Sequence, residues 1–175
     1  SMFKNSLVAL SILLGLSGCV SMEKNNENIS SEILTLDTLA DKSFFNANIE
    51  YLKTILSEDF IYVHSGAARI ETKQETLKSF VQIKFTSWER QTQEVRVYGK
   101  ETTAMVSGFV TVGFESMAPL KYYVQRLYEK SGENWELVSQ HTNFALDSQA
   151  QVSEVTKYLY QNYWSKSALL TIPEE

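Results

Sequence analysis

Histidine is scarce in this chain of 175 residues, and one of its two histidines is the residue best suited to acid–base chemistry. His64 ends the run FIYVH at positions 60–64, whose aromatic and β-branched residues predict a strand. Its imidazole can exchange a proton near neutral pH without strong tuning. Tyr62 lies two residues earlier and is therefore expected on the same face of that strand. The simpler interpretation is a histidine at a strand end whose ring is satisfied by a backbone carbonyl.

Cys19 is the only cysteine, so no internal disulfide can form. Lys4 and an apolar run over 7–16 precede it, and Ser17 and Gly18 come directly before it. A positive start, a short hydrophobic segment and small residues at a cleavage site are typical of a secretory signal. The set Leu-Ser-Gly-Cys also resembles the lipobox of bacterial lipoproteins, in which the cysteine carries the lipid. We expect a signal peptide at 1–19 and lipidation of Cys19; the alternative is an ordinary signal with an unmodified thiol.

The residues after Cys19 predict where the protein resides. Val20 and Ser21 follow it, with no aspartate directly after the cysteine. In a Gram-negative cell this resembles the pattern for sorting to the outer membrane, so we expect a lipid-anchored protein of the cell envelope that faces the periplasm. The polar segment 20–31 predicts a tether between the anchor and the folded domain.

Composition argues against several other classes of protein. The net charge is −5 and basic residues do not cluster, which argues against nucleic acid as a partner. No second apolar stretch approaches the ~18 residues that a membrane-spanning helix requires. With two histidines and no His-x-x-x-His or carboxylate–histidine cluster, we expect no metal site. The sequence has no glycine-rich phosphate loop and no serine or cysteine nucleophile motif, so we expect no cofactor.

The elements that must position His64 begin with helices. Apolar residues recur at helical spacing over 31–47 and again over 49–56, which predicts two helices. The strand at 60–64 then turns back into a short partner at 69–71. The sequence TKQE at 72–75 forms a capping box, in which threonine and glutamate each satisfy a free backbone N–H, and it begins a third helix.

Four long strands are expected next, at 88–98, 102–114, 120–130 and 135–146. Each follows the previous one after a short turn or modest loop, which favours an antiparallel meander. Helices followed by a curved sheet, with one helix inserted early, indicate an α+β fold. Trp88 begins this sheet, where it is a core residue, part of a pocket rim or a dimer contact.

The last segment predicts an additional helix. Residues 148–170 carry apolar side chains at helical spacing and are rich in tyrosine, so we assign 147–175 to a C-terminal helical extension. Most amphipathic helices pack on their own domain. A dimer contact or a lid over a pocket are the alternatives.

Four short motifs support a family resemblance. LSEDF at 56–60 precedes the first strand, and 66–77 resembles the pattern G-x-x-x-(T/S)-K-x-x-x-L. VRVYG followed by TAMV lies within 95–106, and QRLY with a later glycine and tryptophan lies within 125–135. In this order the motifs resemble the nuclear transport factor 2-like (SnoaL-like) superfamily, in its domain-of-unknown-function 4440 branch, close to the calcium/calmodulin-kinase association domain. The resemblance implies a domain at 32–146, with three helices and a curved mixed or antiparallel sheet that form a cone.

The resemblance also implies site residues. Arg126 matches the arginine of the cationic pocket in the association domain, where it could hold a carboxylate, and Tyr128 shares its strand face. The same similarity places Gln140 and Thr142 in the pocket and His141 on the convex side. If the strand register differs, His141 could instead approach His64 in a paired-imidazole site.

A comparison with ketosteroid isomerases, which share this fold, bears on catalysis. His64 falls where those enzymes carry their carboxylate base. Ala40 falls where they carry an oxyanion tyrosine, which departs from their chemistry.

Taken together, the residues lead us to expect a pocket that binds a small organic ligand, with an anion as one option. Its contacts would be Tyr62, His64, Arg126, Tyr128, Gln140 and Thr142. The alternatives are a proton-transfer enzyme of isomerase or dehydratase type with His64 as catalytic base, and a non-catalytic interaction module. The convex face of this fold often pairs with a second copy, so we expect a homodimer.

Overall fold

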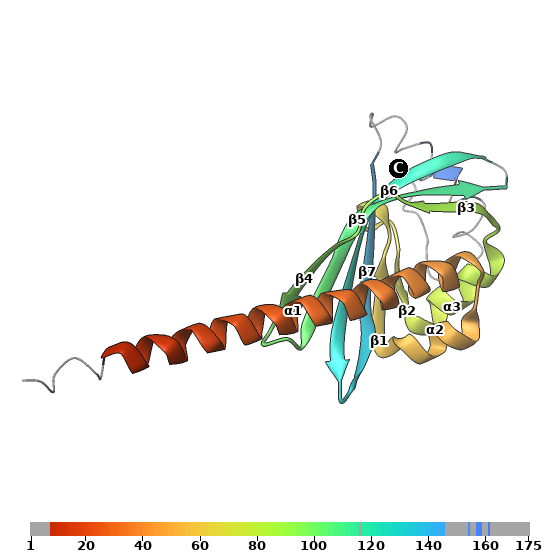
Figure 1. Cartoon of the computed structure of the whole chain (residues 1–175). Coiled ribbons are helices and arrows are strands. Elements are labelled where there is room, and N and C mark those ends of the chain that lie inside the picture. The colour runs from red at the N-terminus through yellow and green to blue at the C-terminus, as the bar shows by residue number, and fades with distance from the viewer. Residues whose placement is uncertain (1–7, 116, 146–153, 155–156, 159–160, 162–175) are drawn as a thin grey trace, which may run out of the picture.

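The computed structural model describes residues 8–115 and 117–145, together with residues 154, 157, 158 and 161. Three helices lie within these residues: α1 (Val8–Phe45), α2 (Ile49–Ile55) and α3 (Lys73–Gln82). The predicted capping box is confirmed, because the Thr72 side chain accepts from the Glu75 N–H while the Glu75 side chain accepts from the Thr72 N–H. Figure 1 shows α1 as a long rod across the molecule, with α2 and α3 beside its C-terminal end.

A single curved sheet forms the rest of the described fold. Its members are β1 (Leu56–Val63), β2 (Ile70–Thr72), β3 (Phe85–Arg90), β4 (Glu94–Tyr98), β5 (Thr103–Phe114), β6 (Met117–Ser131) and β7 (Asn134–Phe144), with a 3-10 turn at Ser65–Ala67. The order is β2-β1-β7-β6-β5-β3, and β4 pairs with the other half of β5. The β1–β7 pair is parallel and the others are antiparallel. The predicted α+β cone with a mixed sheet is therefore confirmed.

One predicted strand is interrupted. We expected a continuous strand at 88–98, but residues 91–93 separate β3 from β4. Gly108 on β5 permits the interruption, since a Cβ atom there would lie 1.9 Å from the carbonyl oxygen of Thr92. The Thr92 hydroxyl in turn accepts a hydrogen bond of 2.9 Å from the Phe109 N–H. This close backbone approach bends the edge of the sheet inward, which only a glycine at 108 allows.

Helix α1 differs from its prediction at the N-terminal end. We expected it to begin at Ser31, but it begins at Val8 and includes the segment predicted to be a tether. Ile29 is 8% exposed and belongs to the core, so α1 contacts the domain ahead of the predicted boundary at residue 32. The Asn25 side chain also donates to Glu101 in the β4–β5 turn. Within the described residues, none of the helices is both long and apolar enough to cross a membrane.

The buried face of α1 supplies much of the core. Ile33, Ala40 and Phe44 are fully buried and pack with α2 and with strands β1, β5, β6 and β7. On β5, Ala104, Val106, Val110 and Val112 share one face and are buried. Of the predicted C-terminal extension, all but four residues lie outside the described residues, so that prediction stays a prediction.

Candidate functional site

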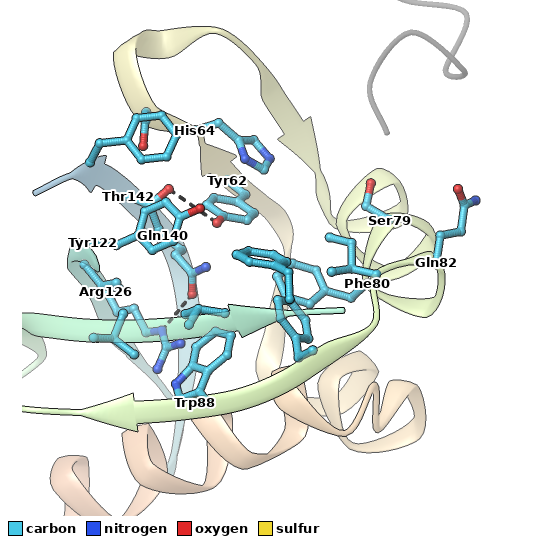
Figure 2. Close-up of a pocket in the computed structure, with 18 residues that line it drawn as sticks. Tyr62, His64, Ser79, Phe80, Gln82, Trp88, Tyr122, Arg126, Gln140 and Thr142 are labelled. Atoms are coloured by element: carbon cyan, nitrogen blue, oxygen red, sulfur yellow. Dashed lines mark hydrogen bonds between the residues drawn. The ribbon is translucent and has the colours of Figure 1, made fainter. Parts of the chain in front are cut away.

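A cavity of about 80 Å³ lies between the concave face of the sheet and α3 (Figure 2). A single water needs roughly 10–15 Å³ of such space, so the cavity has room for a small organic group. One wall is apolar, and six aromatic side chains line it: Phe80, Phe85, Trp88, Phe114, Tyr122 and Phe144. Gln82 at the end of α3 also lines the cavity and is exposed, so the cavity reaches solvent there.

Part of the sheet forms a polar wall: Arg126, Gln140 and Thr142 lie on the same face of β6 and β7 as the aromatic Tyr122 and Phe144. Arg126 Nε donates to Gln140 Oε1 at 2.7 Å. The Tyr62 hydroxyl lies 3.3 Å from the Thr142 hydroxyl. Burial raises the pKa of Tyr62, and side-chain hydrogen bonds with Thr142 and Gln140 partly oppose this effect. The tyrosine is therefore neutral over the physiological range and available as a hydrogen-bonding group.

His64 stands at one end of this polar wall, directly after β1. Its ring stacks on Tyr62 with 4.0 Å between the ring centroids, and Nε2 lies 3.1 Å from Glu71 Oε2. Tyr62 and Glu71 are cross-strand partners in the β1–β2 pair, which is why the histidine two residues later meets this carboxylate. The imidazole therefore lies beside a buried carboxylate.

Glu71 is fully buried and has three partners. Arg69 Nε lies 2.9 Å from its Oε1, and the Ser79 hydroxyl donates to the same oxygen at 2.6 Å. Burial alone would raise the pKa of Glu71, but the hydrogen bonds from His64 and Ser79 and the positive charge of Arg69 lower it below its usual value. An ionised carboxylate behind an imidazole orients the ring and stabilises its protonated form. The side chain of His64 is 12% exposed and lines the cavity.

Arg126 lies at the other end of the polar wall, in a second buried charge cluster. Its Nη1 lies 3.0 Å from Asp37 Oδ1 and 2.7 Å from Asp41 Oδ1, and both carboxylates come from α1. Arg90 from β3 reaches the same two carboxylates, at 2.7 Å and 3.2 Å. Two arginines and two aspartates make a cluster without net charge.

Asp37 is the centre of this second cluster. Burial acts to raise its pKa, but Arg126, Arg90 and hydrogen bonds from Tyr128 and Gln93 lower the pKa to about 2. The Tyr128 hydroxyl donates to Asp37 Oδ1 at 2.8 Å. The paired carboxylates raise the pKa of Arg126, so Arg126 and Asp37 are both ionised at neutral pH.

The structure brings five of the six predicted ligand contacts to the cavity: Tyr62, His64, Arg126, Gln140 and Thr142. Tyr128, the sixth, does not line it. Its side chain is buried against α1, where its hydroxyl binds Asp37. We had expected Trp88 in the core, at a pocket rim or at a dimer contact. It lines the cavity and packs edge-on against Phe85.

The register of β7 with β6 determines which residues of β7 face inward. Arg126 pairs with Gln140, but Tyr128 pairs with Leu137 because a bulge shifts the β6–β7 register between Leu127 and Tyr128. The shift brings Leu137 to the inner face, where it is fully buried opposite Tyr128. Beyond the bulge the alternation holds, and Gln140 and Thr142 face inward.

His141 alternates with these inward residues. It pairs with Gln125 of β6 and Val63 of β1, so it lies on the outer face of the sheet, as the resemblance implied. The alternative of a paired-imidazole site with His64 is therefore wrong.

Sequence reasoning missed three residues that build the site: Asp37, Asp41 and Glu71. A signal was present for the first two, because they lie on the same helical face as Ile33, Ala40 and Phe44 and are therefore expected to be buried. Carboxylates on a buried face need cationic partners. Glu71 gave no such signal, since its partners come from a strand pairing and a helix. Among the described residues, no group of three or more histidine, cysteine, aspartate or glutamate side chains could hold a metal ion.

Comparison with known families identifies the class of protein. The family model of the SnoaL-like domain matches residues 35–147. This is well over half of the chain, and the chain therefore belongs to the SnoaL-like family. No curated protein matches the sequence.

Solved structures show the same fold at low sequence identity. A nuclear transport factor 2-like protein from Cytophaga hutchinsonii is 15% identical, with a TM-score of 0.59 over 66% of this chain and 97% of its own. The hub homology domain of calcium/calmodulin-dependent kinase II from Chlamydomonas reinhardtii is 17% identical, with a TM-score of 0.57 over 66% and 97%. A protein of the same superfamily from Streptomyces avermitilis, described as a candidate dehydratase, is 13% identical, with a TM-score of 0.60 over 69% and 99%.

Proposed function

We propose that this protein binds a small, mainly apolar organic molecule inside its cone. The observation that carries the proposal is the cavity itself, which is lined by aromatic side chains and by a hydrogen-bonded set of polar side chains. Concave sites with this division of surface are typical of small-molecule pockets. A module used only for interaction predicts instead a cone that its own side chains fill.

The charge of the preferred ligand follows from the buried clusters. We had expected an anion as a possible ligand because Arg126 could hold a carboxylate. Asp37 and Asp41 already neutralise that arginine, and Glu71 already engages Arg69 and His64. The cavity therefore offers hydrogen-bonding groups without an excess positive charge, which supports an uncharged ligand.

The test compares wild type with variants in which a larger side chain fills the cavity. The quantity measured is the binding of a small uncharged aromatic compound. We expect α-methylstyrene to bind, as detected by calorimetry or ligand-observed NMR, and Val112→Phe to weaken binding at least tenfold. Val81→Phe is the matched control, because Val81 is 61% exposed on α3 and does not line the cavity. If overpacking unfolds the first variant, Ile83→Trp at the cavity wall provides a second blocking substitution. Equal binding by wild type and both blocked variants would contradict the proposal.

A second candidate function, proton transfer with His64 as base, is favoured by the His64–Glu71 pair. A carboxylate on one ring nitrogen orients the imidazole and stabilises the imidazolium that forms when the ring accepts a proton. The candidate dehydratase among the similar structures shares the fold, which by itself is not evidence of the same chemistry. Ala40 is fully buried in the core, so the oxyanion tyrosine of the isomerases is not present at that position.

Proton transfer can be tested without knowing the natural substrate. Acetophenone carries weakly acidic protons on its methyl group, and a base that removes one of them in D₂O leaves deuterium in its place. Catalysis by His64 predicts that the protein accelerates this exchange and that His64→Gln abolishes the acceleration. Binding of acetophenone without any acceleration would restrict the protein to binding.

We also propose that the protein is anchored in the cell envelope through a lipid on Cys19 and works as a homodimer. The support is the lipobox-like sequence before Cys19 and the resemblance described above. Labelling cells with a radioactive fatty acid tests the anchor, with Cys19→Ser as the unlabelled control. Sedimentation of the purified domain tests the dimer.

A further inference from the structure

Glu71 connects two side chains that line the cavity, although it does not line the cavity itself. Its Oε1 accepts a hydrogen bond of 2.6 Å from the Ser79 hydroxyl, and its Oε2 lies 3.1 Å from His64 Nε2. Ser79 lies on α3 and His64 directly after β1, and both line the cavity (Figure 2). A buried carboxylate therefore joins two separate elements at the cavity.

The turn after β1 brings this carboxylate to the imidazole. The His64 N–H donates to the Arg69 carbonyl oxygen at 2.9 Å, and Tyr62 pairs with Glu71. Arg69 and Glu71 are two residues apart where β2 begins, so their side chains lie on the same side of the strand. Arg69 Nε accordingly lies 2.9 Å from Glu71 Oε1. The local pairing thus places Arg69 on one oxygen of Glu71 and His64 on the other.

The contact between Nε2 and Oε2 determines where the neutral imidazole carries its proton. Both atoms are inaccessible to solvent. With the proton on Nδ1, a lone pair of Nε2 would face a carboxylate oxygen at 3.1 Å, and two acceptors at that distance repel each other. With the proton on Nε2, the ring directs an N–H toward that oxygen. The partner of one ring nitrogen fixes the tautomer, so the neutral ring is protonated at Nε2.

The same burial decides which nitrogen a molecule in the cavity can reach. The His64 side chain lines the cavity and is 12% exposed, but its Nε2 is inaccessible. Proton exchange between the ring and a molecule in the cavity therefore has to use Nδ1. In the tautomer fixed by Glu71, Nδ1 is an acceptor.

Arg69 would control an amide that replaced the carboxylate. Its Nε carries an N–H and can only donate, whereas the Ser79 hydroxyl can donate or accept. In Glu71→Gln the amide oxygen therefore has to face Arg69, and the amide NH₂ group then faces His64. A donor beside Nε2 requires a lone pair on Nε2, which moves the ring proton to Nδ1.

We infer that Glu71 and Arg69 are positioning residues that set the tautomer of His64, with the ring proton on Nε2 and the acceptor at Nδ1. The tautomer is a property of the protein without a ligand. Its consequence for chemistry rests on the second candidate function, proton transfer by His64. In the acetophenone reaction, Nδ1 takes the methyl proton, the electron pair of the broken C–H bond stays on the substrate as an enolate, and the Nε2 proton remains beside Glu71.

Nuclear magnetic resonance reads the tautomer directly. The chain has only two histidines, and protonated and unprotonated ring nitrogens resonate far apart in long-range ¹H–¹⁵N spectra of protein with ¹⁵N-labelled histidine. The spectra are recorded at increasing pH until the ring shifts stop changing, so that the neutral ring is observed. We expect the neutral His64 ring to carry its proton on Nε2. His141, on the outer face of the sheet, is the internal control and is assigned from His141→Gln.

Three variants test the role of Arg69. Glu71→Gln should move the His64 proton to Nδ1. Arg69→Met should keep the wild-type tautomer, because both oxygens of the carboxylate are acceptors. The double variant should return the proton to Nε2, since without Arg69 the amide can turn its oxygen toward His64. A merely structural role for the two residues predicts neither the reversal nor its restoration, and His141 should be the same in all variants.

Deuterium exchange of acetophenone connects the tautomer to function. Glu71→Gln should lose most of the acceleration although His64 is intact, and the double variant should recover part of it. Without acceleration by wild type, the second candidate function fails, and a proton on Nε2 still supports the tautomer. A proton on Nδ1 in wild type overturns the inference and requires no variant to fold. A proton that stays on Nε2 in Glu71→Gln overturns the role of Arg69.

Discussion

Two buried charge clusters flank the cavity, and they differ in what they hold together. The first cluster joins Asp37 and Asp41 of α1 to Arg90 and Arg126 of the sheet, and the Asp37 and Arg126 side chains are fully buried. The second joins His64, Arg69 and Glu71 with Ser79 of α3, and its histidine reaches the cavity.

The two clusters differ in the groups that they contain. In the first cluster the charges balance, and Asp37 stays ionised near neutral pH because its pKa is about 2. In the second, a histidine that lines the cavity is the partner of a buried carboxylate. The first is therefore suited to fastening a helix to a sheet, and the second to acting on a ligand.

The most severe test of this distinction is Asp37→Asn. Removing one carboxylate leaves two buried arginines with a single counter-charge, and breaking such a cluster costs about 3–5 kcal/mol of unfolding free energy. Urea denaturation at pH 7 measures it. Glu50→Gln, which removes the exposed Glu50–Lys53 pair, is the control and should have no measurable effect.

A smaller loss is expected for Glu71→Gln. The amide can still accept a hydrogen bond from Ser79 and occupies the same volume, so we expect a cost of about 2 kcal/mol from the lost charge-assisted contacts. A cost equal to that of Asp37→Asn would show that the two clusters have the same structural role, and the comparison would fail.

The pH dependence of stability sharpens the comparison further. The pKa of Asp37 in the folded protein is about 2, below its usual value of 3.8, so its ionised form stabilises the fold above pH 3.8. This contribution, about 2 kcal/mol for a shift of that size, is lost as the pH falls toward 2. Glu71 acts in the same direction. Wild type should therefore lose more stability between pH 5 and pH 2 than Asp37→Asn does; parallel curves for the two proteins would refute this.

The smallest effect is expected for Thr72→Ala, next to Glu71. It removes the hydroxyl that caps α3, which accepts from the Glu75 N–H and donates to Glu75 Oε2, at a cost of about 1 kcal/mol. Because no charge changes, we expect the loss to be the same at pH 7 and pH 5, as measured by denaturation. A strongly pH-dependent loss would mean that Thr72 supports the charge cluster and not only the helix.

Much of the fold could be predicted from local patterns, and the exceptions have identifiable causes. The capping box at Thr72 depends on neighbouring residues and was found from spacing. The break between β3 and β4 depends on the close approach of Thr92 to Gly108, and the bulge opposite Tyr128 depends on how β6 pairs with β7, so no local pattern shows them.

The same division holds for the site. Tyr62, His64, Arg126, Gln140 and Thr142 were placed at the cavity by strand alternation and family resemblance. Their partners were not, because ion pairs such as Arg126–Asp37 join residues 89 positions apart. The sequence predicted Arg126 as a free cation that could hold an anion. With its partners in place, the site is instead a neutral arrangement of hydrogen-bonding groups.

The sequence by itself determined the class of this protein, since hydrophobic periodicity, turn residues and the order of short motifs are local properties of the chain. Only the tertiary structure decided which charges are compensated. The physical reason is that burial and ion pairing depend on distances across the fold, and a few ångströms decide whether an arginine is neutralised or available to a ligand.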